Sequence, residues 1–168
     1  MELHGAAIVR SCSAPILNRM SDLPAPRRVE EHLCFALYAA QHAFNAAYKP
    51  LLEPLGLTYT QYLVLLVLWE RDGLTVKDLA LRLHLDSGTL TPVLKRMERS
   101  DLIGRERKQS NQREVRIELT AKGRALRSEA GRIYDSLACK LGGTQEGLAA
   151  LLSGLQSLAP QLRGPVRE

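Results

Sequence analysis

Two short amphipathic helices joined by a tight connection constrain the fold of this chain most. Residues 75–83 begin with a capping box, Thr75 and Asp78, and carry apolar residues at helical spacing, which predicts a short helix. A second helix is predicted over 86–100 with Asp86 as its N-cap, and Pro92 predicts a late start or an irregular first turn. Such a pair is typical of a helix-turn-helix, although many helical pairs share this spacing.

An extended segment after these helices makes the prediction more specific. Val115, Ile117 and Leu119 alternate with polar residues, which is typical of a strand with one buried face. The polar turn 109–112 separates this strand from an extended stretch near 102–105, so a β-hairpin is predicted. We therefore predict a mainly α fold with a small β-hairpin wing, a winged helix-turn-helix.

Helices on both sides of this unit are predicted to form a dimer. Residues 29–52 repeat apolar side chains at three- and four-residue steps, and Pro50, Pro54 and Gly56 are expected to end that helix. A capping box at Thr58 opens a buried helix. A long helix is expected from Thr120 to about Lys140 and a last one over about 145–158.

These elements predict one domain after a tail. The winged-helix domain covers 29–168, with dimerisation helices at about 29–52 and 120–168 and a DNA-binding part at about 58–119. Residues 1–28 lack periodicity and are expected to be disordered. Met20 leaves a later translation start open, so residues 1–19 and Cys12 are set aside.

Composition excludes several classes of protein. Of the 168 residues 45% are hydrophobic and 24% charged, which is typical of a soluble globular chain. The longest uncharged apolar run, 62–69, is much shorter than the roughly 20 residues of a membrane span. Three cysteines, an odd number, disfavour a secreted disulfide scaffold. A cytoplasmic protein with reduced cysteines is expected.

Positive charge is concentrated in one part of the chain. Residues 95–127 contain eleven lysines and arginines against five acidic residues, whereas the net charge of the whole chain is only +5. A basic block in an otherwise neutral domain indicates a polyanionic partner, with nucleic acid first. A solvated basic face explains the charge alone equally well.

Cys34 is the candidate for chemistry. It lies in about the second turn of the first predicted helix, and the partial positive charge of a helix N-terminus stabilises a thiolate. His32 would add to this effect when protonated. The alternative is structural, because a lone cysteine on an apolar helix is usually a small buried hydrophobe.

Two tyrosines share a helix face with Cys34. Tyr38 is one turn away, whereas Tyr48 lies about 21 Å along the axis. Cys34 and Tyr48 of one straight helix therefore cannot touch, and they meet only if the first helix of a second chain crosses antiparallel. Alternatively, Tyr48 is an ordinary residue of a dimer seam. Both readings favour a symmetric dimer, which suits a helix-turn-helix reading two half-sites.

Several long runs of residues carry a family resemblance. They are LCFALY at 33–38, YKPLL at 48–52, LTYTQYLVLLVLW at 57–69 and LDSGTLTPVLKR at 85–96. Over roughly residues 30–140 the chain resembles the organic-hydroperoxide sensors, OhrR, of the MarR family. The resemblance implies a dimeric winged-helix repressor that releases its operator when a cysteine is oxidised.

The resemblance also implies roles for individual residues. Cys34 would be the peroxidatic cysteine, hydrogen-bonded by Tyr48 and Tyr59 of the partner chain, with Tyr38 beside it. Cys139 matches the resolving cysteine of the two-cysteine subgroup, which implies an intersubunit disulfide with Cys34. A thiolate oxidised to sulfenic acid condenses with a second thiol in this way. If Cys139 is instead a surface or packed thiol, a small cellular thiol must resolve the sulfenic acid.

The DNA contacts are expected from the second helix and the wing. Small hydroxyl side chains near the helix start reach bases or phosphates, and basic side chains contact phosphates or lie exposed as plain surface charges. The predicted contacts are Ser87, Thr89, Thr91, Lys95, Arg96, Arg105, Arg107, Lys108 and Arg113. The family usually has Asp-x-Arg at the wing tip, whereas this chain has Asn111-Gln112-Arg113, which loses the charge that braces the arginine.

Three functions stay open from the sequence. The first is a peroxide-responsive repressor that binds an inverted-repeat, double-stranded DNA operator as a homodimer, with organic hydroperoxides as effectors. The second keeps the fold but responds to a phenolic ligand between the first, second and fifth helices. The third is a thiol peroxidase, which the basic wing disfavours. No cofactor is expected, and His32, Cys34 and His42 lack the spacing of a metal site.

Overall fold

The computed structural model describes residues 28–107, 115–142 and 144–163, which fall into two units. The first ends at Ala40 and contains η1 (Val29–Glu31) and the start of α1 (Leu33–Leu52). The second, from Gln41, holds the rest of α1 and all later elements. Most of the predicted tail, Met20 and Cys12 included, lies outside the described residues.

The first helix begins later than the periodicity predicted. His32 has extended backbone angles and separates η1 from α1, so the α-helix starts at Leu33. Cys34 therefore lies in the first turn rather than the second. The helix ends at Leu52, as predicted, and it includes Pro50 because losing one backbone bond in the last turn does not end a helix. It tightens into η2 (Glu53–Leu55) and stops at Gly56, whose φ of 65° favours glycine.

Local capping signals position the next three helices as expected. Thr58 and Gln61 form both bonds of a capping box at α2 (Tyr59–Glu70). Thr75 and Asp78 do the same at α3 (Val76–Leu83). Asp86 accepts the Thr89 N–H at the start of α4 (Ser87–Arg99). The prediction of a late start was wrong, since this cap begins α4 ahead of Pro92, which lies inside the helix.

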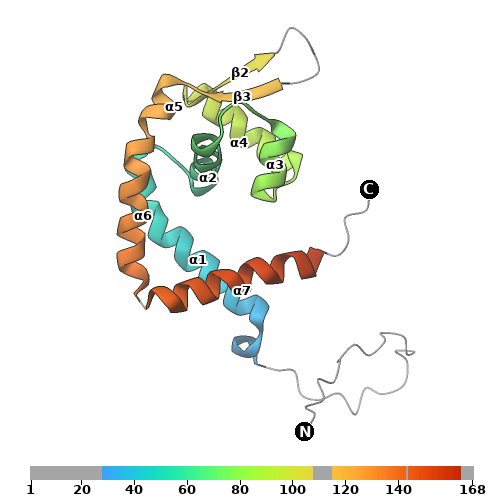
Figure 1. The fold of residues 1–168 in the computed structure, drawn as a ribbon, viewed down its shortest axis with the longest axis vertical. Helices are drawn as coiled ribbons and strands as arrows, with labels where there is room; N and C mark the ends of the chain where they lie inside the picture. The colour runs from blue at the N-terminus through green and yellow to red at the C-terminus, as the bar shows by residue number, and fades with distance from the viewer. Residues whose placement is uncertain (1–27, 108–114, 143, 164–168) are drawn as a thin grey trace, which may run out of the picture. The chain divides into compact units, whose positions relative to one another are not determined.

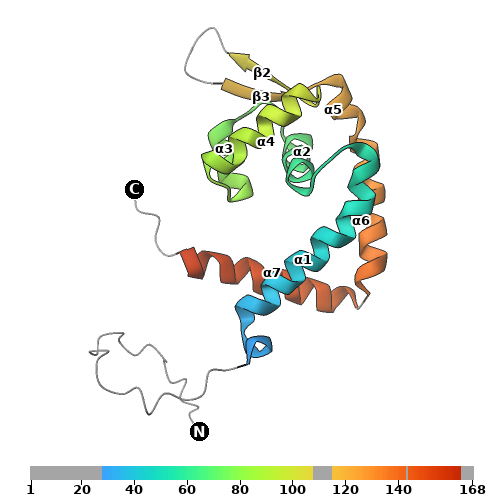
Figure 2. The same ribbon diagram turned by 180° about the vertical axis from the view of Figure 1, so that it is seen from behind.

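The wing is confirmed and belongs to a three-stranded antiparallel sheet. Strands β2 (Ile103–Arg107) and β3 (Val115–Leu119) pair with Ile103 opposite Leu119. A strand that the sequence did not indicate, β1 (Leu74–Thr75), adds to the other edge of β3. Figures 1 and 2 show β2 and β3 lying beyond α4, with α2 and α3 on the other side of that helix. The predicted turn 109–112 lies outside the described residues.

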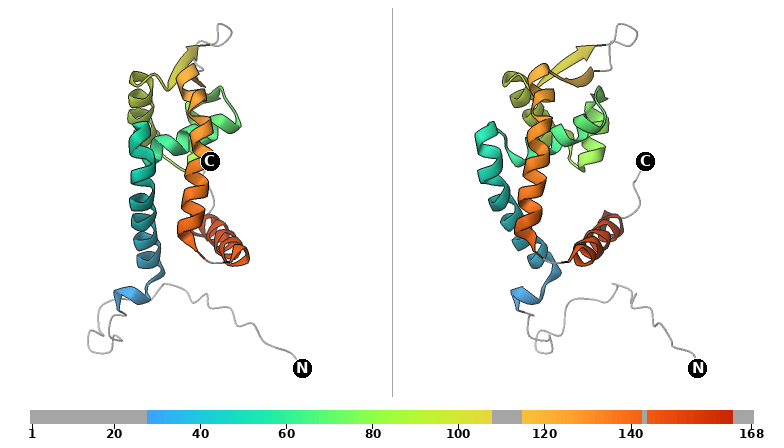
Figure 3. Two further views of the ribbon diagram at one scale, coloured as in Figure 1. Left: turned by 90° about the vertical axis from the view of Figure 1, so that its left-hand side faces the viewer. Right: turned by 60° about the vertical axis from the view of Figure 1, so that its left-hand side comes forward.

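The helical C-terminal part differs from the prediction in its breaks. The expected helix from Thr120 is two helices, α5 (Ala121–Ala125) and α6 (Arg127–Leu141), because the ψ of −12° at Leu126 tightens the turn between them. The last helix, α7 (Gln145–Arg163), runs past residue 158 and includes Pro160. Figure 3 shows α6 continuing from α5 and α7 leaving α6 at a sharp bend.

One hydrophobic core holds the second unit together. It is formed by α2, α3, α4 and the sheet, whose side chains are fully buried at Leu65, Leu68, Leu79, Leu90, Leu94, Met97, Ile103 and Ile117. By contrast, α7 is mostly exposed, and its apolar side chains include Leu151 and Leu152 at 59% and 57% exposure. Within the described residues no single helix is long and apolar enough to cross a bilayer; α1–η2 and α2 meet that test only as a bent pair.

Candidate redox and DNA-binding site

Tyrosine side chains from α1 and α2 meet in the second unit. The ring centroids of Tyr48 and Tyr59 lie 4.8 Å apart, and those of Tyr48 and Tyr62 lie 5.8 Å apart. Tyr59 is the first residue of α2 because Thr58 caps that helix, and η2 with Gly56 turns the chain so that α2 meets α1. The structure thus brings together two of the tyrosines that the sequence singled out.

Burial keeps these phenols in the protonated form. Burial, followed by the nearby phenols of Tyr59, Tyr62 and Tyr134, raises the pKa of Tyr48 to about 12. Burial also raises the pKa of Tyr59. The pKa of Tyr62 is raised by burial and, to a smaller extent, by the nearby phenol of Tyr59. Since a neutral phenol is a hydrogen-bond donor, Tyr48 and Tyr59 can donate to an anion throughout the neutral pH range.

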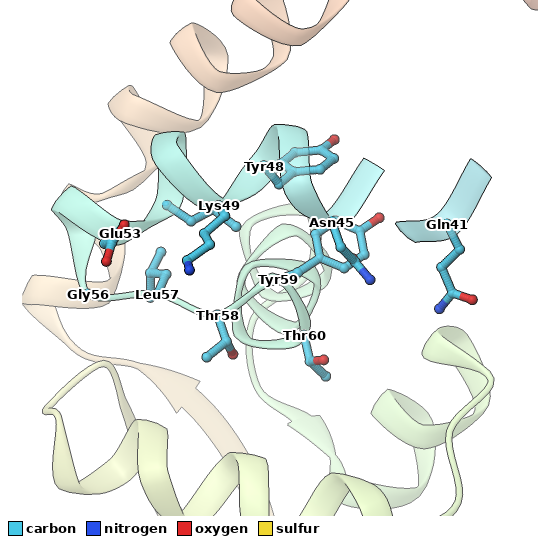
Figure 4. A pocket seen from close by; sticks show the side chains of 11 residues that line it. Gln41, Asn45, Tyr48, Lys49, Glu53, Gly56, Leu57, Thr58, Tyr59 and Thr60 are labelled. Atoms are coloured by element: carbon cyan, nitrogen blue, oxygen red, sulfur yellow. The ribbon is translucent and has the colours of Figure 1, made fainter. Parts of the chain in front are cut away.

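Tyr48 and Tyr59 line a cavity of about 580 Å³. Figure 4 shows Gln41, Asn45 and Lys49 along one side of α1, with Thr58 and Thr60 at the start of α2. These polar residues were missed in the sequence, although Gln41, Asn45 and Lys49 recur every fourth residue and so share a helix face. The cavity lining therefore combines aromatic rings with hydroxyl, amide and ammonium donors.

Cys34 occupies an exposed position in the first unit. It is the second residue of α1, and with Val29, His32, Phe35 and Tyr38 it lines an open hollow of about 500 Å³. The rings of Phe35 and Tyr38 stack with centroids 6.4 Å apart. In the single chain the sulfur is therefore accessible to a small oxidant.

Cys139 is also an exposed thiol. It lies near the end of α6 in the second unit, whereas Cys34 belongs to the first. Neither cysteine is in a disulfide within the chain. In the single chain Cys139 is therefore a surface thiol, which is compatible both with a resolving role and with the alternative of a surface cysteine.

The helix-turn-helix presents its polar face at the start of α4. His84, with a φ of 55°, turns the chain between α3 and α4. The Thr89 hydroxyl donates to Asp86 at 2.7 Å, and the bonds from Thr89 hold the pKa of the Asp86 carboxyl below its ordinary value. Ser87, Lys95 and Arg96 are exposed, whereas Thr91 is half-buried. Thr89 therefore has a capping role besides the predicted DNA contact.

Of the basic wing residues predicted to contact DNA, only Arg105 has a side chain within the described part of the structure. Arg105 forms an ion pair with Glu98 of α4 at 3.2 Å, so its guanidinium ties the wing to α4. Arg107 ends β2, but its side chain lies outside the described part of the structure. Lys108, Arg113 and the Asn111-Gln112 tip also lie outside the described residues.

Comparison with known proteins decides the family. The model of the MarR family matches residues 57–115. The chain is 45% identical over 161 residues, 94% of this chain and 83% of the relative, to the HTH-type transcriptional regulator TtmR of Methylorubrum extorquens. It is also 45% identical over 135 residues to the organic hydroperoxide resistance transcriptional regulator of Bacillus subtilis, covering 80% and 92% of the two chains. The chain belongs to the MarR family. It is a transcriptional regulator, as are these relatives, rather than an enzyme.

Solved structures of MarR-type regulators agree with the fold. Reduced AbfR of Staphylococcus epidermidis bound to DNA matches with a TM-score of 0.63 and 36% identity, covering 75% of this chain and 88% of that one. The disulfide form of AbfR matches with a TM-score of 0.56 and 35% identity, covering 76% and 90%. The winged helix-turn-helix predicted from the sequence is therefore confirmed.

Proposed function

We propose that this MarR-family regulator is a dimeric repressor that senses organic hydroperoxides through Cys34 and releases its operator when Cys34 is oxidised. The pairing of Tyr48 with Tyr59, 4.8 Å apart beside a cavity, carries this proposal. Two neutral phenols at one point supply the two donors that a partner's Cys34 sulfur needs. The identity to an organic hydroperoxide regulator supports the same input.

The proposed chemistry has two balanced steps. The Cys34 thiolate attacks one peroxide oxygen, the O–O bond breaks, and the alcohol leaves after taking up a proton; sulfur becomes a sulfenic acid. The thiol of Cys139 from the second subunit then attacks that sulfur, and water leaves as the disulfide forms. Tyr48 and Tyr59 hold the thiolate before the first step, and Tyr38 lines the approach beside Cys34.

Exposed apolar side chains support the dimer. Phe44 of α1 and Leu151, Leu152 and Leu155 of α7 are all exposed, and such side chains along helices are typical of surfaces that a second chain covers. A two-fold dimer would present two copies of α4 to the two halves of an inverted-repeat operator. Exposed Ser87, Lys95 and Arg96 would then contact bases and phosphates, with Arg105, Arg107, Lys108 and Arg113 of the wing.

DNA binding with and without an organic hydroperoxide tests this function. Cumene hydroperoxide is expected to weaken operator binding by the wild-type protein by about tenfold or more, the usual size of allosteric coupling. Cys34→Ser should stay bound, and on a non-reducing gel both Cys34→Ser and Cys139→Ser should lack the covalent dimer. Release of Cys34→Ser by the hydroperoxide would refute redox sensing.

A phenolic effector is the second candidate, favoured by the cavity itself. Its volume of about 580 Å³ falls within the range of small-molecule sites. Release of both wild type and Cys34→Ser by a phenol such as salicylate, with no effect of hydroperoxide, would favour this candidate.

A further inference from the structure

Helix α2 extends from the tyrosines to a contact with α5. Tyr59 is its first residue and Trp69 its last but one, about 15 Å apart at the rise of an α-helix. The helix is embedded in the core, with Val64 and Leu65 fully buried and Leu68 at 1% exposure. A packed helix moves as a body rather than bending, so displacement at one end reaches the other.

Aromatic contacts run along the same path. The ring of Tyr48 contacts Tyr59 and Tyr62, and the ring of Tyr62 meets Trp69 edge-on with centroids 6.4 Å apart. The tyrosines that line the cavity are therefore in ring contact, through Tyr62, with the indole at the far end of α2.

The indole is tied to the middle of α5. Its Nε1–H donates to the carbonyl oxygen of Gly123 at 2.9 Å, across 54 residues of sequence. Gly123 leaves no room for adjustment, because a Cβ there would lie 2.1 Å from the carbonyl oxygen of Leu102. Trp69 thus donates to a residue whose backbone packs closely against the backbone of Leu102.

Residues 100–102, where α4 ends and the wing begins, are held by this same turn. The Thr120 hydroxyl donates to the carbonyl oxygen of Asp101 at 2.6 Å, and the Thr120 N–H donates to that of Leu102. The Lys122 ammonium donates to the carbonyl oxygen of Ser100 at 2.8 Å. These bonds tie the turn that contains Gly123 to the C-terminal end of α4.

We propose that Trp69 is the positioning residue that couples the tyrosine cluster to the junction of α4 and the wing, so that a change at Tyr48 and Tyr59 alters the placement of α4. This inference rests on the proposed redox function, since oxidation of Cys34 is what would change the contacts of the two tyrosines. Trp69 touches neither DNA nor the oxidised sulfur in this scheme; it acts through Gly123.

Trp69 is the single tryptophan of the chain, so its fluorescence reports on this junction directly. DNA-free wild-type protein is treated with cumene hydroperoxide in a stopped-flow instrument. A change in indole emission is expected at the rate at which Cys34 loses its thiol, and Cys34→Ser should show no change. Emission that stays constant while the oxidised protein loses DNA affinity would overturn the coupling role but leave the redox function standing.

Trp69→Phe provides a second measurement, because phenylalanine keeps an aromatic ring and lacks the N–H donor. The ratio of reduced to oxidised DNA affinity is expected to shrink by roughly three- to tenfold, the equivalent of one net hydrogen bond, with no change in the rate of Cys34 oxidation. Ser128→Ala is the matched control, since it also removes one side-chain bond to a backbone carbonyl, that of Ala125, three residues earlier in the chain.

The outcomes separate the two claims. An unchanged affinity ratio in Trp69→Phe, or an equal loss in Ser128→Ala, would refute the role of Trp69. Failure of hydroperoxide to release wild-type protein from DNA would instead refute the proposed function.

Discussion

Asp72, in the loop after α2, bonds to β3 and α5 through one carboxylate, and its substitution tests which of its bonds matter. Oδ1 accepts the backbone N–H groups of Gly73 and of Leu119 in β3, both at 2.9 Å. Oδ2 accepts from the Arg124 guanidinium of α5 at 2.8 Å. The Leu119 bond is partly buried, whereas the side chain of Arg124 is 58% exposed. The Leu119 bond should therefore contribute more than the ion pair.

The two groups of bonds can be separated by two substitutions. Asp72→Ala removes all three bonds and should lower the free energy of unfolding by about 2–3 kcal/mol in total. This total is small for three hydrogen bonds to a charged acceptor because the site is partly exposed. Asp72→Asn keeps an acceptor for both N–H groups and loses only the exposed ion pair, so it should cost less than about 1 kcal/mol.

Urea unfolding at one fixed protein concentration measures both costs, since the stability of a dimer depends on concentration. An unchanged m-value would show that the substitutions affect stability alone. Equal losses in Asp72→Asn and Asp72→Ala would refute this reasoning, because the ion pair and not the backbone bonds would then hold the wing.

Three further predictions follow from other residues. Gly123→Ala should destabilise the protein by about 1–3 kcal/mol in the same assay, because its Cβ meets the Leu102 carbonyl, and a neutral result would mean that the turn relaxes easily. The pKa of Tyr48 is about 12, above its ordinary 10.0, so the phenol loses its proton at a higher pH in the folded state than in the unfolded state. The contribution of Tyr48 to stability should therefore be complete below pH 10 and fall from pH 10 to 12. Tyr48→Phe should lessen that fall. Lys95→Ala should weaken binding to operator and random DNA alike and reduce the salt slope by about 1, whereas a loss confined to the operator would indicate a base contact.

Much of the candidate site could be found in the sequence because its signals are local. Cys34 stands out as a thiol at the start of a helix, and Asp86 and Thr89 are three residues apart within one cap. The burial of Thr91 and the ion pair of Arg105 could be seen only in the structure. Thr91 is half-buried, and Arg105 pairs with Glu98. Neither feature has a local pattern, since each depends on residues brought together by folding.

The boundaries that the sequence misplaced have the same origin. Pro92 disfavours a helix locally, yet α4 begins ahead of it because the Asp86 cap, the neighbouring turns and packing outweigh one missing N–H. Strand β1 is only two residues long, too short for alternation to show, and exists because Leu74 lies opposite Ile117.

The amino-acid sequence by itself determined the capped starts of α2, α3 and α4, the alternating strand and the winged helix-turn-helix, since caps and periodicity act within a few residues along the chain. Only the tertiary structure decided that Tyr48 meets Tyr59, that Trp69 binds Gly123 and that Asp72 holds the wing. Contacts between residues tens of positions apart depend on the path of the whole chain, and no local pattern encodes them.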